Sequence, residues 1–363
     1  MCAALDWYHV TALGRLNVDP HKAVTKPPVF IVGAPRSGTT LLLNMLNRHA
    51  SLAIARETQF QRMVYARRKA FGDLTDPRNR QRLVREYLST KRFQRLGIET
   101  SKLADRLLQD ATDYRAFFTL LLEHYAQSQG KSRFGEKTPY HADFAETLCE
   151  WYPGAVILHL VRDPRDVVAS LQRMPWASHS VLNNARVWLN LNRSAQRSRH
   201  RPGYLEVRYE ALVTKPEREL ARICVHLGEE WSDSMLVPRE EATSYSWWTR
   251  RSVQPVTSDL IGTWKHQLRG DEVALIEWMA GDEMDRLGYQ LSAVPPSLLH
   301  LAQGSMAAAF DSIRVRLGYL PASLHRIMGP TQLAKEEFRV LGHMWKTDRP
   351  KDRTDSTPSD STP

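Results

Sequence analysis

The residues with the clearest chemical potential lie in a short loop near the start of the chain. The apolar run Val29–Val32 ends in the sequence Gly-Ala-Pro-Arg-Ser-Gly, and a helical pattern of leucines follows. A strand, a tight loop and a helix in this order aim backbone N–H groups and the positive end of a helix dipole at an anion, usually a phosphate. The pattern predicts a phosphate-binding site made of Arg36, Ser37, Gly38, Thr39 and Thr40.

This loop departs from the nucleotide-binding loop that serves Mg-ATP. That loop reads G-x-x-x-x-G-K-[ST]. Gly33 and Gly38 have its spacing, but Thr39 occupies the position of its lysine, and the nearby cation is Arg36. A P-loop nucleotide kinase or NTPase is the alternative enzyme, and the missing lysine argues against it.

A second candidate anion site follows another apolar run, residues 155–161. Asp163 suits the N-cap of a helix and Asp166 its third position, so a helix start explains both aspartates. It does not explain Arg162 at the end of the strand, or Ser170 further along the helix. A guanidinium and a hydroxyl near one helix start can hold a second phosphate group.

These two loops need a parallel sheet to position them. Strand patterns alternate with longer helical patterns along the chain, which predicts an α/β, P-loop-containing nucleotide-binding fold with a central parallel sheet flanked by helices. Ligands of such sheets bind at the carboxyl ends of the strands. Arg36, Arg162 and Tyr209 all fall at predicted strand ends.

The sequence also predicts how the chain is divided. Residues 1–27 read as a helical arm and linker, and residues 28–290 as the main domain. Residues 291–346 read as a Leu- and Arg-rich helical extension. Residues 347–363 are mostly Asp, Thr, Ser and Pro, a composition typical of a disordered tail.

The charge balance favours anionic partners. The formal net charge is +10, which attracts nucleotides, nucleic acid or an anionic membrane surface. A nucleic-acid-binding protein would leave the two loops unexplained, so no nucleic-acid partner is expected. The 3 cysteines form no CxxC pair, and no apolar stretch reaches the roughly 20 residues of a membrane span. We expect a cytoplasmic protein, with peripheral membrane contact through basic segments as a further expectation.

Taken together, the two loops resemble the sulfotransferase superfamily, whose members use 3′-phosphoadenosine 5′-phosphosulfate (PAPS). The sequence PRSGTT resembles the family's 5′-phosphosulfate loop. RDPRDVVASL resembles its 3′-phosphate site, with Arg162 and Ser170 at the family's spacing. The resemblance covers roughly residues 28–290 and points to the bacterial branch that shares motifs with protein-tyrosine and some carbohydrate sulfotransferases. Further similar motifs follow in order around Glu57, Lys137, Tyr209 and Lys265.

The resemblance implies a sulfotransferase that binds PAPS and needs no metal. Sulfuryl transfer resembles phosphoryl transfer, so the protein mainly positions the reactants and stabilises charge on the leaving phosphate. Arg36 would hold the 5′-phosphate, and Lys137 would be a second cation near the transferred group. Tyr209 would lie near the adenine, or is an ordinary strand-end aromatic. Lys265 falls in the family's late cofactor segment, although the Arg-Lys-Gly that precedes it in cytosolic enzymes is missing.

The residue predicted to deprotonate the acceptor is Glu57. It stands at the spacing from Arg36 where the tyrosylprotein-type enzymes place their catalytic glutamate. Alternatively, Glu57 is a surface carboxylate paired with Arg56 or Arg62. His141 is the rival base, because cytosolic sulfotransferases use a histidine after a Lys-Thr pair, but here two residues are inserted.

The acceptor is expected to be a small molecule, a glycan or a lipid. The segments that usually vary with the acceptor in this fold contain Trp176, His179, Trp188 and residues 247–251, which read Trp-Trp-Thr-Arg-Arg. They are candidates for the acceptor pocket or, alternatively, for the core and a lid.

Overall fold

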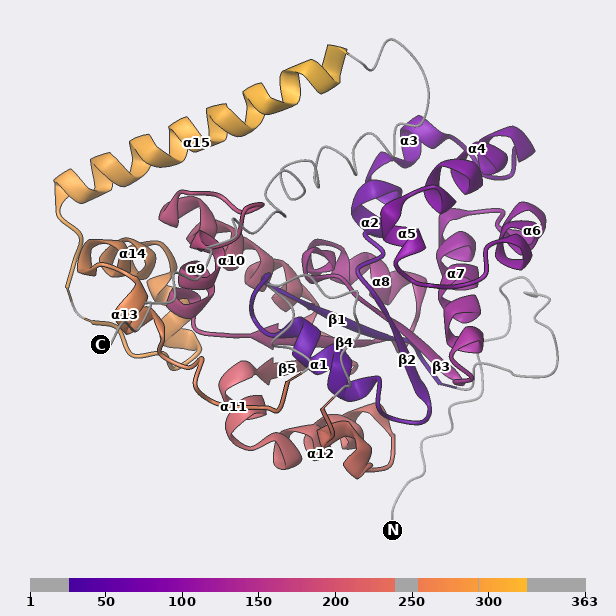
Figure 1. The fold of residues 1–363 in the computed structure, drawn as a ribbon, viewed down its shortest axis with the longest axis horizontal. Helices are drawn as coiled ribbons and strands as arrows, with labels where there is room; N and C mark the ends of the chain where they lie inside the picture. Colours follow the sequence, from indigo (N-terminus) through magenta and orange to yellow (C-terminus); the bar gives the residue numbers. More distant parts are fainter. Residues whose placement is uncertain (1–25, 239–253, 293, 325–363) are drawn as a thin grey trace, which may run out of the picture.

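A sheet of parallel strands forms the centre of the molecule (Figure 1). The computed structural model describes residues 26–238, 254–292 and 294–324. The strands are β1 (Val29–Gly33), β2 (Leu52–Arg56), β3 (Arg133–Lys137), β4 (Val156–Val161) and β5 (Tyr204–Arg208). They lie in the order β2-β3-β1-β4-β5, and every neighbouring pair is parallel. The predicted α/β fold with a central parallel sheet is confirmed.

Helices connect the strands and cover the sheet. After β1 comes α1 (Thr39–Leu46). Between β2 and β3 lie α2 (Phe60–Met63), η1 (Tyr65–Arg67), α3 (Arg68–Phe71), α4 (Pro77–Leu88), α5 (Lys91–Gln94), α6 (Ser101–Asp110) and α7 (Tyr114–Ser128). Between β3 and β4 lie η2 (Pro139–Phe144) and α8 (Ala145–Trp151), and between β4 and β5 lie α9 (Pro164–Gln172), α10 (Val181–Gln196) and η3 (Arg197–His200). After β5 come α11 (Tyr209–Thr214), α12 (Pro216–Leu227), η4 (Asp233–Leu236), α13 (Trp264–Gln267), α14 (Gly270–Arg286) and α15 (Leu298–Leu324).

Both faces of the sheet are buried, as alternate residues of β1 show. Val29 and Ile31 belong to an apolar cluster shared with α1, α11 and α12. Phe30 and Val32 belong to a second cluster shared with α7, α8 and α10. Successive side chains of a strand point to opposite faces, so a sheet covered on both sides requires the continuous apolar runs seen in this sequence.

The helices between β2 and β3 are held together by an aromatic cluster. The ring of Phe60 on α2 stacks on Phe118 of α7, with centroids 4.9 Å apart, and on Phe117 at 5.4 Å. Tyr87 of α4 meets Phe60 edge-on at 5.6 Å. The cluster fixes α2 just beyond the residues that follow β2, so the segment carrying Glu57 is held between the sheet and this cluster.

The carboxyl ends of neighbouring strands meet at one edge of the sheet. The register pairs Arg56 of β2 with Lys137 of β3, and Gly33 of β1 with Leu160 of β4. The residues that follow β2, β3, β1 and β4 therefore lie side by side, and most of the predicted site residues belong to these segments.

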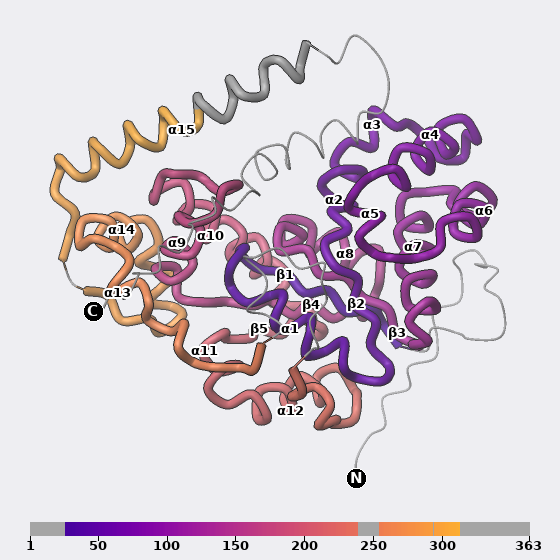
Figure 2. Tube along the Cα trace, in the orientation of Figure 1, coloured from indigo at the N-terminus to yellow at the C-terminus, as the bar shows by residue number. Residues whose placement is uncertain are grey.

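Helix α15 lies across α10 and α14, away from the centre of the sheet (Figures 1 and 2). It falls within the predicted extension at 291–346. The rest of that extension beyond residue 324, the predicted tail at 347–363 and residues 1–25 of the predicted arm lie outside the described residues. Within the described chain, no helix combines the length and the apolar character needed to cross a membrane.

Candidate active site

The loop after β1 contains two residues with positive φ, and the ring of Tyr209 packs against it. Arg36 has φ 72° and Gly38 has φ 97°, both in the left-handed region. A Cβ on Gly38 would lie 2.5 Å from Cδ2 of Tyr209, so the ring packs directly on the loop and only glycine fits there. Gly38 is also the N-cap of α1, and no side chain caps this helix. The first N–H groups of α1 are thus placed to bind an anion.

In the segments after β1 and β4, two buried donors have no hydrogen-bond partner within the described chain. They are the hydroxyl of Ser37, a fully buried residue, and Nε of Arg162, a residue only 6% exposed. Leaving such a group unpaired costs about 1–3 kcal/mol. Native proteins keep few groups of this kind, and an anion bound between the loops would satisfy both.

The two predicted phosphate loops are bonded to each other. Nε of Arg36 donates to Oγ of Ser170 at 2.9 Å, and Nη1 of Arg162 donates to the carbonyl oxygen of Arg36 at 3.2 Å. Burial and the neighbouring guanidiniums of Arg162 and Arg173 lower the pKa of Arg36 to about 10. Two neighbouring guanidiniums at the strand ends, with Asp166 3.8 Å from that of Arg162, are suited to binding an anionic ligand.

Arg162 is fixed from several sides. Its guanidinium lies over the ring of Tyr209, 4.3 Å from the centroid, and also donates to the carbonyl of Leu260. Nε1 of Trp188 donates to the carbonyl of Arg162 at 3.0 Å. Trp188 is fully buried in the core, so of the two predicted roles for this residue the structure favours the core over the acceptor pocket. Residues 247–251 lie outside the described residues.

The carboxylate of Asp166 holds the late segment of the chain against α9. It accepts from N–H of Gly262 at 2.8 Å, from the hydroxyl of Thr263 at 3.1 Å and from N–H of Trp264 at 3.0 Å. This brings the segment with Lys265 to the second loop. Lys265 itself is exposed and lies over the ring of Trp264, 5.9 Å from its centroid. Within the described chain no hydrogen bond joins it to Arg162 or Ser170, so its predicted role stays a prediction.

Glu57 stands between two cations directly after β2. Nζ of Lys137 lies 2.6 Å from Oε1 of Glu57, and Nη1 of Arg92 lies 3.0 Å from Oε2. The Lys137 side chain is fully buried, and that of Glu57 is 26% exposed. The ion pairs that the structure gives Glu57 are with Lys137, which β3 brings to the carboxylate, and with Arg92, which α5 brings. Of the two alternative partners, Arg56 also lowers the pKa of Glu57 through its charge.

These neighbours set the ionisation of the pair. Burial alone would raise the pKa of Glu57, but Lys137, Arg92 and Arg56 outweigh it and hold that pKa well below its ordinary value. Burial lowers the pKa of Lys137, and the charge of Glu57 opposes this effect. The carboxylate is therefore ionised at neutral pH. Nζ of Lys137 also lies 3.2 Å from Oγ1 of Thr40 on α1, so this lysine spans the space between the loop and Glu57.

The backbone around Glu57 is strained and braced by a buried carboxylate. Glu57 has φ 49° and Gln59 has φ 55°, a conformation that costs non-glycine residues free energy. Oε1 of Glu136 accepts from both N–H and the hydroxyl of Thr58 at 3.0 Å. Nδ1 of the fully buried His141 lies 2.9 Å from Oε2 of Glu136, although the contact lacks hydrogen-bond geometry. His141 thus faces Glu136 behind the segment that carries Glu57.

Sequence reasoning missed two residues of this arrangement. Glu136 lies in the motif Glu-Lys-Thr-Pro that carried the resemblance, and its place before Lys137 in a buried strand was the available signal. Arg92 had no such signal, because it lies 35 residues from Glu57 in a short helix without a motif.

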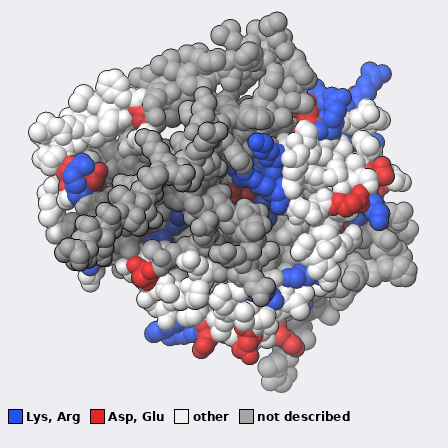
Figure 3. All heavy atoms as spheres, in the orientation of Figure 1, with Lys and Arg blue, Asp and Glu red and all other residues white. Residues whose placement is uncertain are grey.

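The surroundings of the site are basic. Lys and Arg side chains gather near the middle of the face drawn in Figure 3, beside α2 and α5. Among the described residues, no group of three or more His, Cys, Asp or Glu side chains is arranged to hold a metal ion. The arrangement is suited to binding an anionic ligand, with one ionised carboxylate beside it.

Known proteins match this chain in sequence. The model described as the Sulfotransferase family matches residues 27–233. Protein-tyrosine sulfotransferase 2 of Gallus gallus is 28% identical over 295 residues, covering 76% of this chain and 72% of that protein. Nodulation protein NoeE of Sinorhizobium fredii is 26% identical over 294 residues, covering 72% of this chain and 66% of that protein.

A solved structure matches the fold. The sulfotransferase domain from the curacin biosynthetic pathway aligns with a TM-score of 0.51 and 18% sequence identity. The alignment covers 73% of this chain and 99% of that domain. At this identity the similarity concerns the fold alone.

Proposed function

Starting from the premise that this chain belongs to the sulfotransferase family, we propose that it transfers the sulfuryl group of PAPS to a hydroxyl or amine, with Glu57 as the base. The observation that carries the proposal is the 2.9 Å hydrogen bond from Arg36 to Ser170. It joins the two loops predicted to hold the 5′- and 3′-phosphates. The enzyme class follows from the family, and the donor, the acceptor and the residue roles are the proposal.

The residues at the strand ends fit this donor. The N–H groups of α1, the hydroxyl of Ser37 and the guanidinium of Arg36 suit the 5′-phosphosulfate. Arg162, whose Nε has no partner within the described chain, and Ser170 suit the 3′-phosphate. Tyr209 lies against both Gly38 and Arg162, where its ring can border a nucleoside. When bound, the donor supplies an activated phosphosulfate anhydride.

The protein's own groups stabilise charge and position the reactants. Arg36 and Lys137 place positive charge where the leaving phosphate oxygen becomes more negative, and fixed cations in a poorly hydrated site are effective there. Lys137 lies within reach of both Thr40, at 3.2 Å, and Glu57, at 2.6 Å. An anion held at the loop competes with Glu57 for the ammonium group of Lys137.

This competition would make Glu57 a better base when the donor is bound at the loop. While Lys137 and Arg92 both hold the carboxylate, its pKa is low and it accepts a proton poorly. Drawing Lys137 toward the loop raises the pKa of Glu57 toward its ordinary value. The carboxylate oxygen then takes the proton of the acceptor hydroxyl. The 26% exposure of the Glu57 side chain supports access by an acceptor.

His141 is less well placed for the same task. It is fully buried and lies against Glu136. We therefore propose that His141 and Glu136 brace the segment that carries Glu57, and that neither touches the acceptor.

The acceptor in this proposal is a hydroxyl or amine of a small molecule, a glycan or a lipid. The names of similar proteins add the hydroxyl of a protein tyrosine as a candidate. The cytoplasm is the proposed location.

One experiment tests the chemistry and searches for the acceptor together. The purified protein is incubated with PAPS and a cell extract, and products are screened by mass for the gain of one sulfuryl group. The same reaction with Glu57→Gln is the control. A sulfated product that depends on Glu57 supports the proposal.

Nucleotide binding separates this proposal from the P-loop kinase. We expect 3′,5′-ADP to raise the melting temperature of the protein and ATP with Mg²⁺ to leave it unchanged. Stabilisation by ATP with Mg²⁺ and not by 3′,5′-ADP would overturn the choice of donor.

A further inference from the structure

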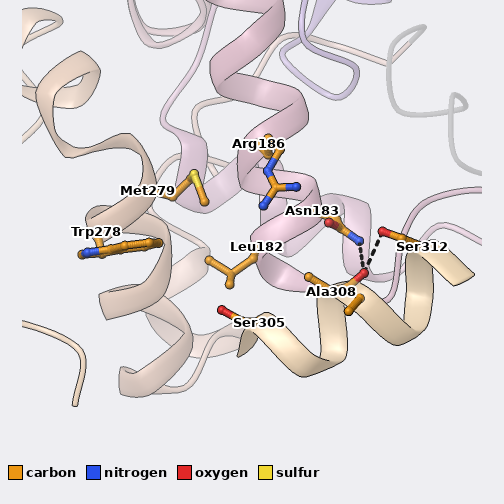
Figure 4. A pocket seen from close by; sticks show the side chains of 9 residues that line it. Leu182, Asn183, Arg186, Trp278, Met279, Ser305, Ala308 and Ser312 are labelled. Atoms are coloured by element: carbon orange, nitrogen blue, oxygen red, sulfur yellow. Dashed lines mark hydrogen bonds between the residues drawn. The ribbon is translucent and has the colours of Figure 1, made fainter. Parts of the chain in front are cut away.

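Helix α15 is attached to the body of the protein by one face. Ala308 is 6% exposed and packs with Leu182 of α10 and Leu275 of α14. A Cβ on Gly304 would lie 3.1 Å from both of these leucines, so glycine lets the helix approach closely. Nδ2 of Asn183 donates to the carbonyl of Ala308 at 3.1 Å (Figure 4). The helix is therefore held in place, and its opposite side faces outward.

That outer face is apolar and uncharged. Residues 298–310 contain no Asp, Glu, Lys or Arg. Four large apolar side chains stand in the solvent here: Leu298 is 86% exposed, Leu299 64%, Met306 56% and Phe310 71%. Single exposed apolar residues are common, but a concentration of this kind marks an interaction surface.

After Asp311, the chain that follows this face is basic as far as residue 335. Residues 312–335 include Arg314, Arg316, Arg326 and Lys335, and no Asp or Glu. An apolar helix face next to basic residues is typical of segments that bind anionic lipid surfaces. A second copy of the chain is a poorer partner, because both copies would carry the same excess of basic residues.

A pocket on the attached side of α15, where Ala308 meets α10, adds a cation near this helix. It has a volume of about 250 Å³ and lies between α10, α14 and α15 (Figure 4). Trp278, which is 55% exposed, and Met279 form one wall, and Arg186 of α10 stands opposite. Arg186 makes no hydrogen bond or ion pair with another residue of the described ranges. An apolar wall next to a guanidinium suits the boundary between the acyl chain and the phosphate of a phospholipid.

We propose that the outer face of α15, residues 298–310, docks this protein onto a membrane surface rich in anionic phospholipid. The four apolar side chains enter the interface, and Arg186 contacts a headgroup phosphate. Docking requires neither nucleotide nor acceptor, so this proposal stands or falls independently of the proposed function.

The test is co-sedimentation of the full chain with vesicles. We expect binding to vesicles of phosphatidylcholine and phosphatidylglycerol, and weaker binding to phosphatidylcholine alone. Replacing Leu298, Leu299, Met306 and Phe310 by Ser should lower partitioning at least about tenfold. Arg186→Gln should weaken binding a few-fold and only to the anionic vesicles. Val225→Ser is the matched control, because Val225 is 81% exposed on α12, across the sheet from α15, and should not alter binding.

Each outcome decides the proposal. Wild-type protein that stays in the supernatant with both vesicles overturns it, as does a fourfold variant that binds like the wild type. A dimer in sedimentation that the fourfold variant loses, without vesicle binding, assigns the face to contact between copies instead. Phe310→Ser alone keeps the test open if the fourfold variant is unstable, and a reduced partition for this variant supports docking.

Discussion

The carboxyl-end edge of the sheet has two halves, one formed by the residues after β1 and β4 and the other by the residues after β2 and β3. The charged side chains of the two halves have different partners. On the side of β1 and β4, burial and the neighbouring guanidiniums of Arg162 and Arg173 lower the pKa of Arg36 to about 10, and the hydroxyl of Ser37 has no partner within the described chain. On the side of β2 and β3, the carboxylate of Glu57 is ion-paired with both Lys137 and Arg92.

The difference indicates how the site would work. In the first half, the hydroxyl of Ser37 and Nε of Arg162 have no partner within the described chain, so a bound anion would satisfy both. The second half must be opened before its carboxylate can act as a base. Lys137 belongs to both halves through Thr40 and Glu57, so binding at the first half can prepare the second.

The largest expected effect is a loss of transfer activity when only the second half, around Glu57, is changed. Glu57→Gln removes the proposed base, and transfer from PAPS should fall about 10²- to 10⁴-fold. The affinity for 3′,5′-ADP, measured by calorimetry, should stay close to that of the wild type, because Arg36, Arg162 and Ser170 are untouched.

His141→Gln, which changes the rival base, should lower transfer far less than Glu57→Gln does. Normal turnover in Glu57→Gln would instead hand the role of base to His141 or to another group.

The next largest effect is a loss of nucleotide affinity when only the first half, around Arg36 and Arg162, is changed. Arg36→Ala and Arg162→Ala should each weaken binding of 3′,5′-ADP about 10- to 100-fold, as expected for a hydrogen bond to a charged group. Arg218→Ala, an exposed arginine on α12, controls for the change in net charge. Unchanged affinity in both variants would remove the two loops from the nucleotide site.

A smaller effect tests how the second half is tuned. Arg92 lowers the pKa of Glu57, so Arg92→Ala should raise that pKa toward its ordinary value. The acid limb of the pH profile of kcat/KM should then move to higher pH, by about one unit at most, with 3′,5′-ADP binding unchanged.

Arg92→Lys keeps the charge and should restore most of the wild-type profile, and Arg78→Ala, an exposed arginine on α4, should not alter it. A profile that stays in place in Arg92→Ala would exclude Arg92 as a positioning residue for Glu57.

The smallest effect tests whether the two phosphate loops act together. Ser170→Ala removes one hydrogen-bond partner of Arg36 and should weaken 3′,5′-ADP binding about fivefold, as expected for the loss of one ordinary hydrogen bond. In a double-mutant cycle, Ser170→Ala and Arg36→Ala should be less than additive, because the residues share one bond. Strict additivity would show that the bond plays no part in binding.

The sequence predicted the parts of the site that depend on local spacing. Gly38 and Thr39 follow a strand directly, and Arg162 and Ser170 share one strand-helix unit, so their neighbourhood is set within a few residues. The parallel sheet followed from strands that alternate with helices, and the structure confirms it. The pairing of Glu57 with Lys137 needed the strand order, because β2 and β3 are neighbours in space with a long helical insertion between them.

Other features depend on packing that the sequence pattern does not contain. Arg92 reaches Glu57 only because the aromatic cluster around Phe60 and Tyr87 positions the helices of that insertion. A tryptophan can line a pocket or pack in a core, so the residue type alone does not predict the role of Trp188. Its complete burial in the structure favours a role in the core. Lys265 lies in a segment that Asp166 brings to the site, but neither spacing nor contacts fix where its ammonium group lies when a ligand is bound.

The pairing of Gly33 with Leu160 has a consequence for donor selectivity. Because β1 and β4 are adjacent, the two phosphate loops start one interstrand spacing apart, about 4.8 Å. If the two loops hold the 5′- and 3′-phosphates as proposed, this strand spacing would help to set the distance between the two phosphate sites. Changes in the loops would then alter how tightly a bisphosphate nucleotide is held, whereas changes in the pairing of β1 with β4 would alter which phosphate spacing fits.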